Sequence, residues 1–256
     1  MLLSSIGYGG RLRALGGLAN HRFLWLIPPG VMTMGGKCPL DLDLARDAVV
    51  RYGTLLEQRG LVFGTGGNLS VRCGDGLWAL KPSGFPCGAL RADDVAVLDM
   101  EGRHLKGGKP SSEWRMHLEI LKANPKVGAV FHTHSRFAAT LACLKWEVPA
   151  VHYYLAAFGD EYIPVVPYRP FGSQELALEA ARAMSSGVKG VLLANHGAVV
   201  AGETPEEAFD LAVNLEFLCE VYWRARSVGT PATLSREQFK EALEGFTSYR
   251  HGARSS

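Results

Sequence analysis

The stretch Val130-Phe131-His132-Thr133-His134 closes an apolar run with two histidines that one residue separates. Successive side chains of a β-strand point to opposite faces of a sheet, so His132 and His134 are expected to share a face. A second apolar run, residues 191–194, is followed after one residue by His196 and then by a glycine. The sequence therefore predicts two buried strands whose ends bring three imidazoles together.

Such a trio of imidazoles can hold a zinc ion. Catalytic zinc sites use three protein ligands and leave a fourth position to water or substrate, whereas structural zinc sites are closed by four. One histidine at a strand end is more often an ordinary polar surface residue, so the argument depends on all three occurring together. We therefore predict an open site for one Zn2+, or another divalent cation, at His132, His134 and His196.

The composition is that of an ordinary soluble globular protein. The 256 residues are 47% hydrophobic and 20% charged, which allows one large domain or two small ones. The formal charge is +2, and no basic stripe alternates with aromatic residues, which argues against nucleic acid or a membrane surface as a partner. The apolar run at residues 23–27 ends at two prolines and is too short to span a bilayer.

The cysteine pattern indicates a reducing compartment. The five cysteines are scattered, odd in number and without a Cys-x-x-Cys pair. Disulfides are rare in cytosolic proteins, so we expect free thiols and a cytoplasmic location. The cysteines are Cys38, Cys73, Cys87, Cys143 and Cys219.

The first 37 residues differ from the rest of the chain. They contain basic residues but no acidic one, many glycines and no sustained hydrophobic period. We expect residues 1–37 to form an N-terminal extension outside a catalytic domain of residues 38–256. Three interpretations stay open: the native start lies at Met32 or Met34, the extension is a disordered tail, or it is a targeting segment. The amphipathic Arg/Ser pattern of a transit peptide is missing, which argues against a targeting segment.

The hydrophobic periods of residues 38–256 alternate between those of helices and strands. Residues 41–59 are predicted to form an amphipathic helix, with Asp41 as its N-cap and Gly60 after its end. Strands are predicted at residues 69–73, 77–81, 95–99 and 130–134, and at 191–196, where the strand ends on His196 before Gly197. The turn Gly74-Asp75-Gly76 between the first two strands is a hairpin signal, so we expect antiparallel pairing there.

The remaining helices are read from their caps. They are predicted at residues 111–122 with Ser111 or Ser112 as cap, at 135–146, at 173–184 and at 204–226, with a final short helix from Ser235. Thr204-Pro205-Glu206-Glu207 combines an N-cap, a first-turn proline and a capping-box glutamate. No strict βαβ alternation, internal repeat or linker is visible. The sequence therefore predicts a single α/β domain with a central, largely antiparallel sheet flanked by helices.

Three polar loops, residues 64–70, 81–84 and 109–113, are rich in glycine and small hydroxyl residues. None matches the P-loop or the dinucleotide-binding pattern. Glycines let backbone N–H groups approach a phosphate closely, and a helix that begins near Ser112 adds the positive end of its dipole. Each loop alone is explained as well by an ordinary turn, and Lys81 and Lys109 by surface lysines. The nearby metal site is what favours a phosphate pocket.

Five motifs carry a resemblance to a known family. They are Thr-Gly-Gly-Asn-Leu-Ser (65–70), Pro-Ser-Gly (82–84), Pro-Ser-Ser-Glu-Trp (110–114), His-Thr-His-Ser (132–135) and Asn-His-Gly (195–197). In this order and spacing the chain resembles the class II aldolase/adducin head family, and within it most closely the L-fuculose-1-phosphate aldolases. The likeness covers roughly residues 41–250 and includes residues 148–153 and 163–172.

The resemblance implies roles for particular residues. His132, His134 and His196 correspond to the zinc ligands. Glu113 corresponds to a carboxylate beside the metal that serves as general acid/base and as a ligand when substrate is absent. Tyr153 corresponds to a tyrosine that reaches the site from a neighbouring subunit as a proton donor, in a homotetramer with its sites at subunit interfaces. The substrate phosphate pocket corresponds to Gly67, Asn68, Ser83, Gly84, Ser111 and Ser112.

The resemblance implies a zinc-dependent aldolase that cleaves a ketose 1-phosphate, similar to L-fuculose 1-phosphate, into dihydroxyacetone phosphate and a short aldehyde. A divalent cation stabilises the enediolate that forms when the carbon–carbon bond breaks. A pentulose-phosphate 4-epimerase, a methylthioribulose-1-phosphate dehydratase and a sugar-acid phosphate decarboxylase need the same site and stay open. Less expected are a non-catalytic assembly module of the adducin kind and a metal-storage or regulatory protein.

Two further features bear on the site. His117 lies four residues after Glu113 and shares its helix face, and we expect it to pack or hydrogen-bond behind the ligands rather than bind metal. The chain departs from the sugar-phosphate aldolase pattern at Arg169 and at residues 158–161, which leaves the aldehyde half of the substrate open.

Overall fold

The computed structural model of the protein describes residues 40–252, with side chains from residue 40 to residue 246. The predicted extension, residues 1–37, lies outside the described residues, as does Cys38. None of the described helices combines the length and apolar character that crossing a membrane requires.

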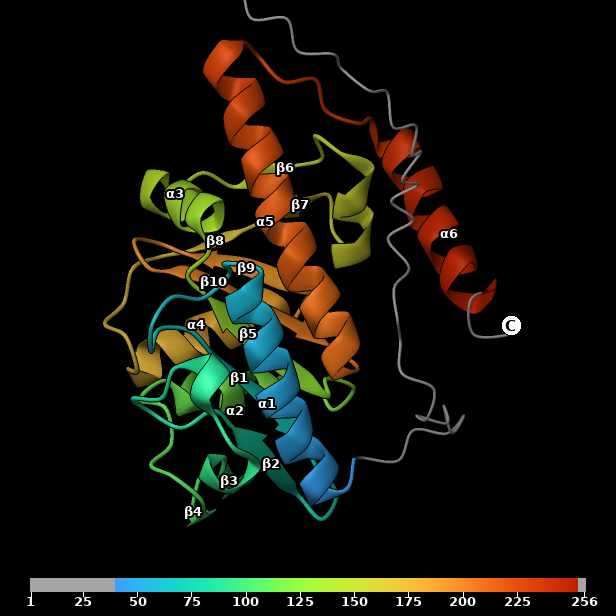
Figure 1. The fold of residues 1–256 in the computed structure, drawn as a ribbon. Helices are drawn as coiled ribbons and strands as arrows, with labels where there is room; N and C mark the ends of the chain where they lie inside the picture. The colour runs from blue at the N-terminus through green and yellow to red at the C-terminus, as the bar shows by residue number, and fades with distance from the viewer. Residues whose placement is uncertain (1–39, 253–256) are drawn as a thin grey trace, which may run out of the picture. The chain divides into compact units, whose positions relative to one another are not determined.

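An eight-stranded sheet runs through the middle of the domain (Figure 1). Its spatial order is β4-β3-β2-β1-β5-β10-β9-β8. Neighbouring strands pair antiparallel except β8 and β9, which pair parallel, so the prediction of a largely antiparallel sheet is confirmed. The strands are β1 (Asn68–Arg72), β2 (Leu77–Leu80), β3 (Ala96–Asp99), β4 (His104–Lys106), β5 (Ala129–Thr133), β8 (Val165–Val166), β9 (Gly190–Leu193) and β10 (Gly197–Gly202).

The predicted hairpin joins β1 and β2. Asp75 has φ of 57° and Gly76 has φ of 71°, and two successive positive φ values are the signature of the tight turns that join antiparallel strands. Leu77 N–H donates to the carbonyl of Gly74 across the turn. The Asp-Gly sequence therefore sets both the turn and the register of Val71 opposite Ala79.

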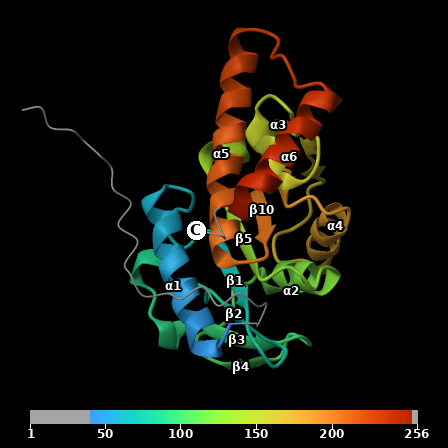
Figure 2. The ribbon, with the colours of Figure 1, turned by 90° about the vertical axis from the view of Figure 1, so that its right-hand side faces the viewer.

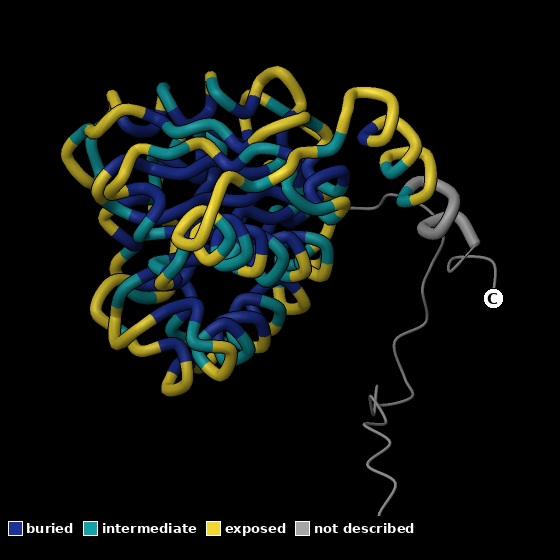
Figure 3. The backbone as a smooth tube through the Cα atoms, turned by 90° about the horizontal axis from the view of Figure 1, so that it is seen from above, coloured by how far each residue is buried: buried dark blue, intermediate teal, exposed yellow. Residues whose placement is uncertain are grey.

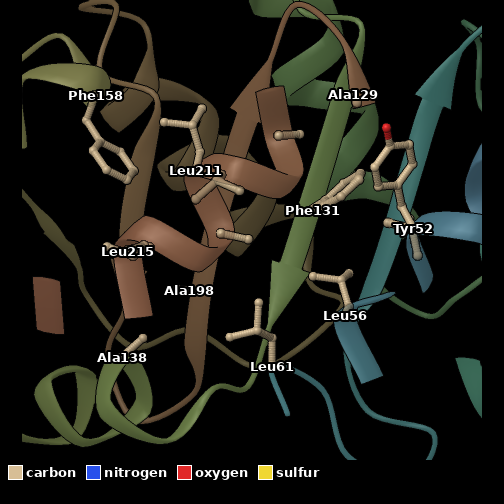
Figure 4. Close-up of a cluster of buried hydrophobic side chains, with 14 of the residues drawn as sticks. Tyr52, Leu56, Leu61, Ala129, Phe131, Ala138, Phe158, Ala198, Leu211 and Leu215 are labelled. Carbon is tan, nitrogen blue, oxygen red and sulfur yellow. The ribbon is translucent and has the colours of Figure 1, made fainter. Parts of the chain in front are cut away.

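Helices cover both faces of the sheet (Figure 2). One face packs against α1 (Leu42–Gln58), α3 (Arg136–Leu144) and α5 (Pro205–Val228), and the other against α2 (Trp114–Ala123) and α4 (Gln174–Met184). The alternation of β5 separates the two cores, because Phe131 belongs to the first and Val130 to the second. Figure 4 shows Phe131 among side chains of the first core, where its ring centroid lies 5.9 Å from that of Tyr52.

Predicted helix caps are confirmed at three starts. Asp41, Ser173 and Thr204 each accept a hydrogen bond from a backbone N–H of the first turn. The predicted cap of α2 is wrong. Its N-cap is Glu113 and the helix begins at Trp114, because Ser111 forms a turn ahead of the helix and its hydroxyl accepts the Glu113 N–H at 3.3 Å.

A smaller layer completes the domain. It contains the pair β6 (Val148–Pro149) and β7 (Tyr162–Ile163), the short helix η3 (Tyr153–Phe158) and α6 (Arg236–Gly252). Two 3-10 turns, η1 (Cys87–Ala89) and η2 (Ala92–Asp94), do not belong to this layer and lie beside α1. The predicted start of α6 is confirmed, since Ser235 and Gln238 exchange hydrogen bonds. The prediction that this helix is short is wrong, because it runs for 17 residues. Figure 3 shows it mostly exposed at the edge of the buried domain.

A carboxylate on α5 caps the helix that follows the histidine strand. Glu216 Oε1 accepts the N–H of Phe137 and its Oε2 accepts the N–H of Ala138, both at 2.9 Å. Ser135, at the N-cap of α3, makes no side-chain capping hydrogen bond. Glu216 therefore satisfies N–H groups at the start of α3 that would otherwise lack a partner.

We expect Glu216→Ala to lower the free energy of unfolding by about 1–2 kcal/mol, because it removes a cap and a favourable charge at a helix N-terminus. The measurement is urea unfolding of the metal-free protein at fixed chain concentration. The control is Glu220→Ala one turn later on α5, which breaks the exposed pair with Arg224 and should cost well under about 1 kcal/mol. Equal losses in the two variants would contradict the capping role.

Candidate metal centre

The histidines converge because β5 and β10 are neighbours. His132 lies on β5 and pairs with Val199 of β10, and His134 follows directly after β5. His196 lies in the short turn that joins β9 to β10. The sequence-based prediction treated Gly197 as the end of a strand, whereas it begins β10. That missed strand is what carries His196 to the end of β5.

Four side chains form the cluster, namely Glu113, His132, His134 and His196. Each offers one ligand atom, and these atoms all lie within 4.8 Å of one another. His132 Nε2 lies 2.9 Å from His134 Nε2 and 3.1 Å from Glu113 Oε2. His196 Nε2 lies 3.4 Å from Glu113 Oε1. The four residues come from three segments that are far apart in the sequence.

Hydrogen bonding and close packing fix the orientation of the imidazoles. His132 Nδ1 lies 2.9 Å from the carbonyl oxygen of Ala198, to which it can only donate, so its other ring nitrogen, Nε2, faces the cluster. A Cβ atom at Gly197 would lie 2.3 Å from the Thr133 carbonyl oxygen and 2.9 Å from His134 Cδ2. The glycine of the Asn-His-Gly motif therefore lets β10 approach β5 where the histidines meet.

The protonation states suit a cation. Burial opposes ionisation of Glu113, but the charge and hydrogen bond of His132 outweigh it and hold the pKa of the carboxyl well below its usual range. Burial would lower the pKa of His132, yet Glu113 raises it. Burial, followed by the charge on His132, lowers the pKa of His134 and of His196 to about 4. Near neutral pH Glu113 is thus an anionic carboxylate and His134 and His196 are neutral imidazoles, which are the forms that bind metals, whereas His132 must release its extra proton when a metal binds.

One carboxylate oxygen of the cluster indicates whether the site suits a metal ion. Glu113 Oε1 is buried, and it has no hydrogen-bond partner among the described residues. A buried carboxylate oxygen without a partner is costly unless something else satisfies it. Three imidazoles and one carboxylate are ligands that divalent transition metals and zinc prefer. The cluster therefore has the donor set and the unmet charge of a metal site.

The residues predicted to bind phosphate lie on adjoining loops. Ser83 N–H donates to the Lys109 carbonyl at 2.8 Å, which joins two of the loops. Ser83, Gly84 and Ser112 are exposed, whereas Ser111 is buried. Gly67 precedes β1 with φ of 72°. Asn68 differs from the others, because its amide Nδ2 donates to Glu113 Oε2 at 2.9 Å and so links the loops to the cluster.

The interpretation of Lys81 as a surface lysine is wrong. Its side chain is buried, with 1% of the residue exposed, and its Nζ donates to the Thr65 carbonyl at 3.2 Å. Burial lowers its pKa. No local pattern predicts this burial, because Lys81 follows β2 directly and the loop at Thr65 that covers it precedes β1. Lys109 is exposed, as expected.

Tyr153 does not join the cluster within one chain. It lies on η3, about half exposed at 51%, and its ring stacks on His152 and packs near Phe246 of α6. The departures from the family pattern have structural roles. Arg169 pairs with Glu179 of α4 at 3.0 Å, and Phe158 is buried in the core.

The comparisons with known proteins agree with this geometry. The model of the class II aldolase and adducin N-terminal domain family matches residues 47–223. The chain belongs to this family. This chain is 45% identical over 194 residues to the 5-methylthioribulose-1-phosphate/5-deoxyribulose-1-phosphate aldolase of Rhodospirillum rubrum. The match covers 76% of this chain and 87% of that one. The chain is 38% identical to the L-fuculose phosphate aldolase of Haemophilus influenzae, covering 74% and 88%.

A solved structure shows the same fold. The structure of an L-fuculose 1-phosphate aldolase superposes on this chain with a TM-score of 0.77 and 34% sequence identity. The match covers 83% of this chain and 100% of that one. The predicted family and fold class are confirmed. The protein is an enzyme of the class II aldolase type, a carbon–carbon lyase.

We expect the metal-free aldolase to lose stability as the pH falls from 6.5 towards 4. The unfolded chain protonates His134 and His196 near pH 6.5, whereas the folded chain keeps both neutral down to about pH 4. The unfolded state therefore binds more protons across this window, and acid favours it. The buried His117, whose pKa burial lowers to about 3, adds a third proton to this difference. Three protons give a slope of about 4.1 kcal/mol per pH unit at most. Urea unfolding at stepped pH measures the slope.

The control for this pH dependence is His196→Asn, which removes one of the three titrating histidines. The slope between pH 6 and 4.5 should fall by about 1.4 kcal/mol per pH unit at most. An unchanged slope would mean that other groups cause the acid sensitivity.

Proposed function

We propose that the protein is a zinc-dependent aldolase that cleaves a ketose 1-phosphate, with a 5-deoxypentulose 1-phosphate as first candidate and L-fuculose 1-phosphate as second. The products are dihydroxyacetone phosphate and a short aldehyde. The convergence of Glu113 with three imidazoles is the observation that carries the proposal. The relatives support the substrate class, since their names specify 5-methylthioribulose, 5-deoxyribulose and fuculose phosphates.

His132, His134 and His196 would hold the zinc ion, with Glu113 as a further ligand when substrate is absent. A bound divalent cation supplies positive charge that stabilises the negative charge of the enediolate. The neutral, half-buried imidazoles of His134 and His196 support this assignment. No Schiff-base lysine is needed, and the buried Lys81 is committed to the Thr65 carbonyl.

The reaction needs one base and one acid. The bond between C3 and C4 breaks, the hydroxyl on C4 loses its proton to become the aldehyde, and C3 gains a proton to complete dihydroxyacetone phosphate. We assign Glu113 as one proton carrier, because its low pKa keeps it an anionic base near neutral pH. We assign Tyr153 as the other, because the hydrogen bond with Tyr154 raises the pKa of its phenol and keeps it protonated.

We assign the substrate phosphate to the polar loops. The proposed set is Gly67, Asn68, Ser83, Gly84, Ser111 and Ser112. Two of these loops are joined by the hydrogen bond from Ser83 to Lys109, and Asn68 connects them to Glu113. The exposed hydroxyl of Ser112 ahead of α2 suits a dianion, because a helix N-terminus attracts negative charge.

We propose that the enzyme is a cytoplasmic homotetramer, in which Tyr153 of the partner subunit completes each site. The exposure of Tyr153 supports a contact with another subunit, since an exposed aromatic ring gains by burial in an interface. The four described cysteines are free thiols, which supports a reducing compartment.

We expect the chain to bind about one zinc ion, because the cluster supplies a single set of ligands. His134→Ala should remove zinc binding and activity together. The measurement is metal content after dialysis, beside turnover. His104→Ala is the control, because His104 is an exposed histidine on β4 whose ring contacts the Lys106 carbonyl of the same strand. A variant H134A that kept its zinc would refute the assignment.

A panel of sugar phosphates tests the reaction, with released dihydroxyacetone phosphate followed by a coupled reductase. The panel holds 5-deoxyribulose 1-phosphate, 5-methylthioribulose 1-phosphate, L-fuculose 1-phosphate, ribulose 5-phosphate and a sugar-acid phosphate. We expect release from the ketose 1-phosphates, fastest for the two pentuloses. Isomerisation, loss of water or loss of CO2 without release would instead identify an epimerase, a dehydratase or a decarboxylase.

A variant of Ser112 tests the phosphate assignment with the best substrate of this panel. Ser112→Ala removes one hydroxyl donor to a charged group, so KM for the best substrate should rise about tenfold. Zinc content should stay at the wild-type value. An unchanged KM would show that the phosphate binds elsewhere.

A further inference from the structure

A buried chain of hydrogen bonds runs from β1 to the candidate metal centre. Ser70 Oγ lies 2.8 Å from His117 Nδ1, His117 Nε2 hydrogen-bonds Asn68 Oδ1, and Asn68 Nδ2 donates to Glu113 Oε2 at 2.9 Å. Ser70 and His117 are fully buried, and Asn68 and Glu113 are 5% and 6% exposed. The mechanism proposed above does not use Ser70 or His117.

The spacing of these residues explains the chain. Asn68 and Ser70 are two apart on β1 and share a strand face, whereas Glu113 and His117 are four apart at the start of α2 and share a helix face. β1 and α2 thus each present two polar side chains, and these side chains face one another where the strand and the helix pack together. Because the groups are buried, each needs a partner, and they satisfy one another.

The chemistry of the groups gives the chain one direction. A carboxylate only accepts and an amide nitrogen only donates, so the Asn68 amide must present Nδ2 to Glu113 and Oδ1 to His117. His117 Nε2 must then carry a hydrogen, and its Nδ1 accepts from the Ser70 hydroxyl. Burial lowers the pKa of His117 to about 3, so the ring is neutral and has one hydrogen to place. A reversed Asn68 amide would set its oxygen against the carboxylate.

We propose that His117 is a positioning residue that fixes the orientation of the Asn68 amide and, through it, the Glu113 carboxylate. Glu113 Oε2 is thereby engaged from the side of β1, and Oε1 has no hydrogen-bond partner among the described residues and lies 3.4 Å from His196 Nε2. The free oxygen is the one available to a metal ion or a substrate proton. This inference rests on the proposed role of Glu113 at the metal.

His117 could instead simply fill space between α2 and the sheet. Both roles imply lost stability when the side chain is replaced, so stability does not separate them. Coupling separates them, because a positioning residue acts only while Asn68 is there to be positioned. A residue that fills space costs the same whether or not Asn68 keeps its amide.

The experiment is a double-mutant cycle read by zinc affinity, measured on the full chain by competition with a chelator and without substrate. His117→Leu should weaken zinc binding about 10–100-fold, as the loss of groups that hydrogen-bond metal ligands does. His117→Gln should recover most of this loss, because its amide N–H can occupy the place of the Nε2–H. In the Asn68→Ala background, H117L should weaken binding no further.

Met116→Ala is the matched control on the same helix, since Met116 is 2% exposed in the α2 core and outside the hydrogen-bond chain. It should lower the melting temperature and leave zinc affinity at the wild-type value. If H117L does not fold, the comparison of H117Q with H117N carries the test, because asparagine is too short to reach Asn68. Equal zinc affinity in H117Q and H117N would then overturn the proposal.

The outcomes separate this inference from the proposed function. Wild-type protein that binds zinc but releases dihydroxyacetone phosphate from no substrate would refute the function. The double-mutant cycle could still be measured, because it uses zinc affinity alone. Additive losses in H117L and N68A, or wild-type zinc affinity in H117L, would refute the positioning role while the aldolase activity stood. Wild-type protein without zinc affinity would refute both.

Discussion

The pairing of β10 with β5 is the constraint on which the candidate site depends. It sets Val199 opposite His132 and Ala198 opposite Thr133, so the turn before β10 lies beside the end of β5. Gly197 makes the approach possible, because any side chain there would collide with the Thr133 carbonyl. Without this pairing, His196 would lie on a separate strand end, and Glu113 would face two imidazoles instead of three.

The cluster concentrates charge where a folded protein would ordinarily avoid it. A buried carboxylate costs free energy unless charges and hydrogen bonds compensate it, and here His132 and Asn68 supply part of that compensation. Glu113 Oε1 stays without a partner, and the low pKa values of His134 and His196 show that their rings resist protonation. An arrangement that is incompletely satisfied by the protein itself is typical of a binding site rather than of a structural core.

The sequence predicts the features that local chemistry determines. The caps at Asp41 and Thr204, the Asp-Gly hairpin and the shared face of His132 and His134 each follow from residues within one turn or strand. The misses depend on contacts between distant segments. β10 was overlooked because Gly197 resembles a terminator until β5 is seen beside it, and the burial of Lys81 depends on a loop from before β1.

Precision at the site comes from segments that carry no ligand of the cluster. α3 begins directly after His134, and Glu216 of α5 holds its first N–H groups. Glu113 is the N-cap of α2, and Asn68 of β1 donates to its carboxylate. A ligand at the end of a strand or helix is free to move unless something beyond that element restrains it, because terminal residues lack half of their backbone partners. The restraint of two ligand-bearing ends by polar side chains from other elements explains why the site needs the α/β domain around it.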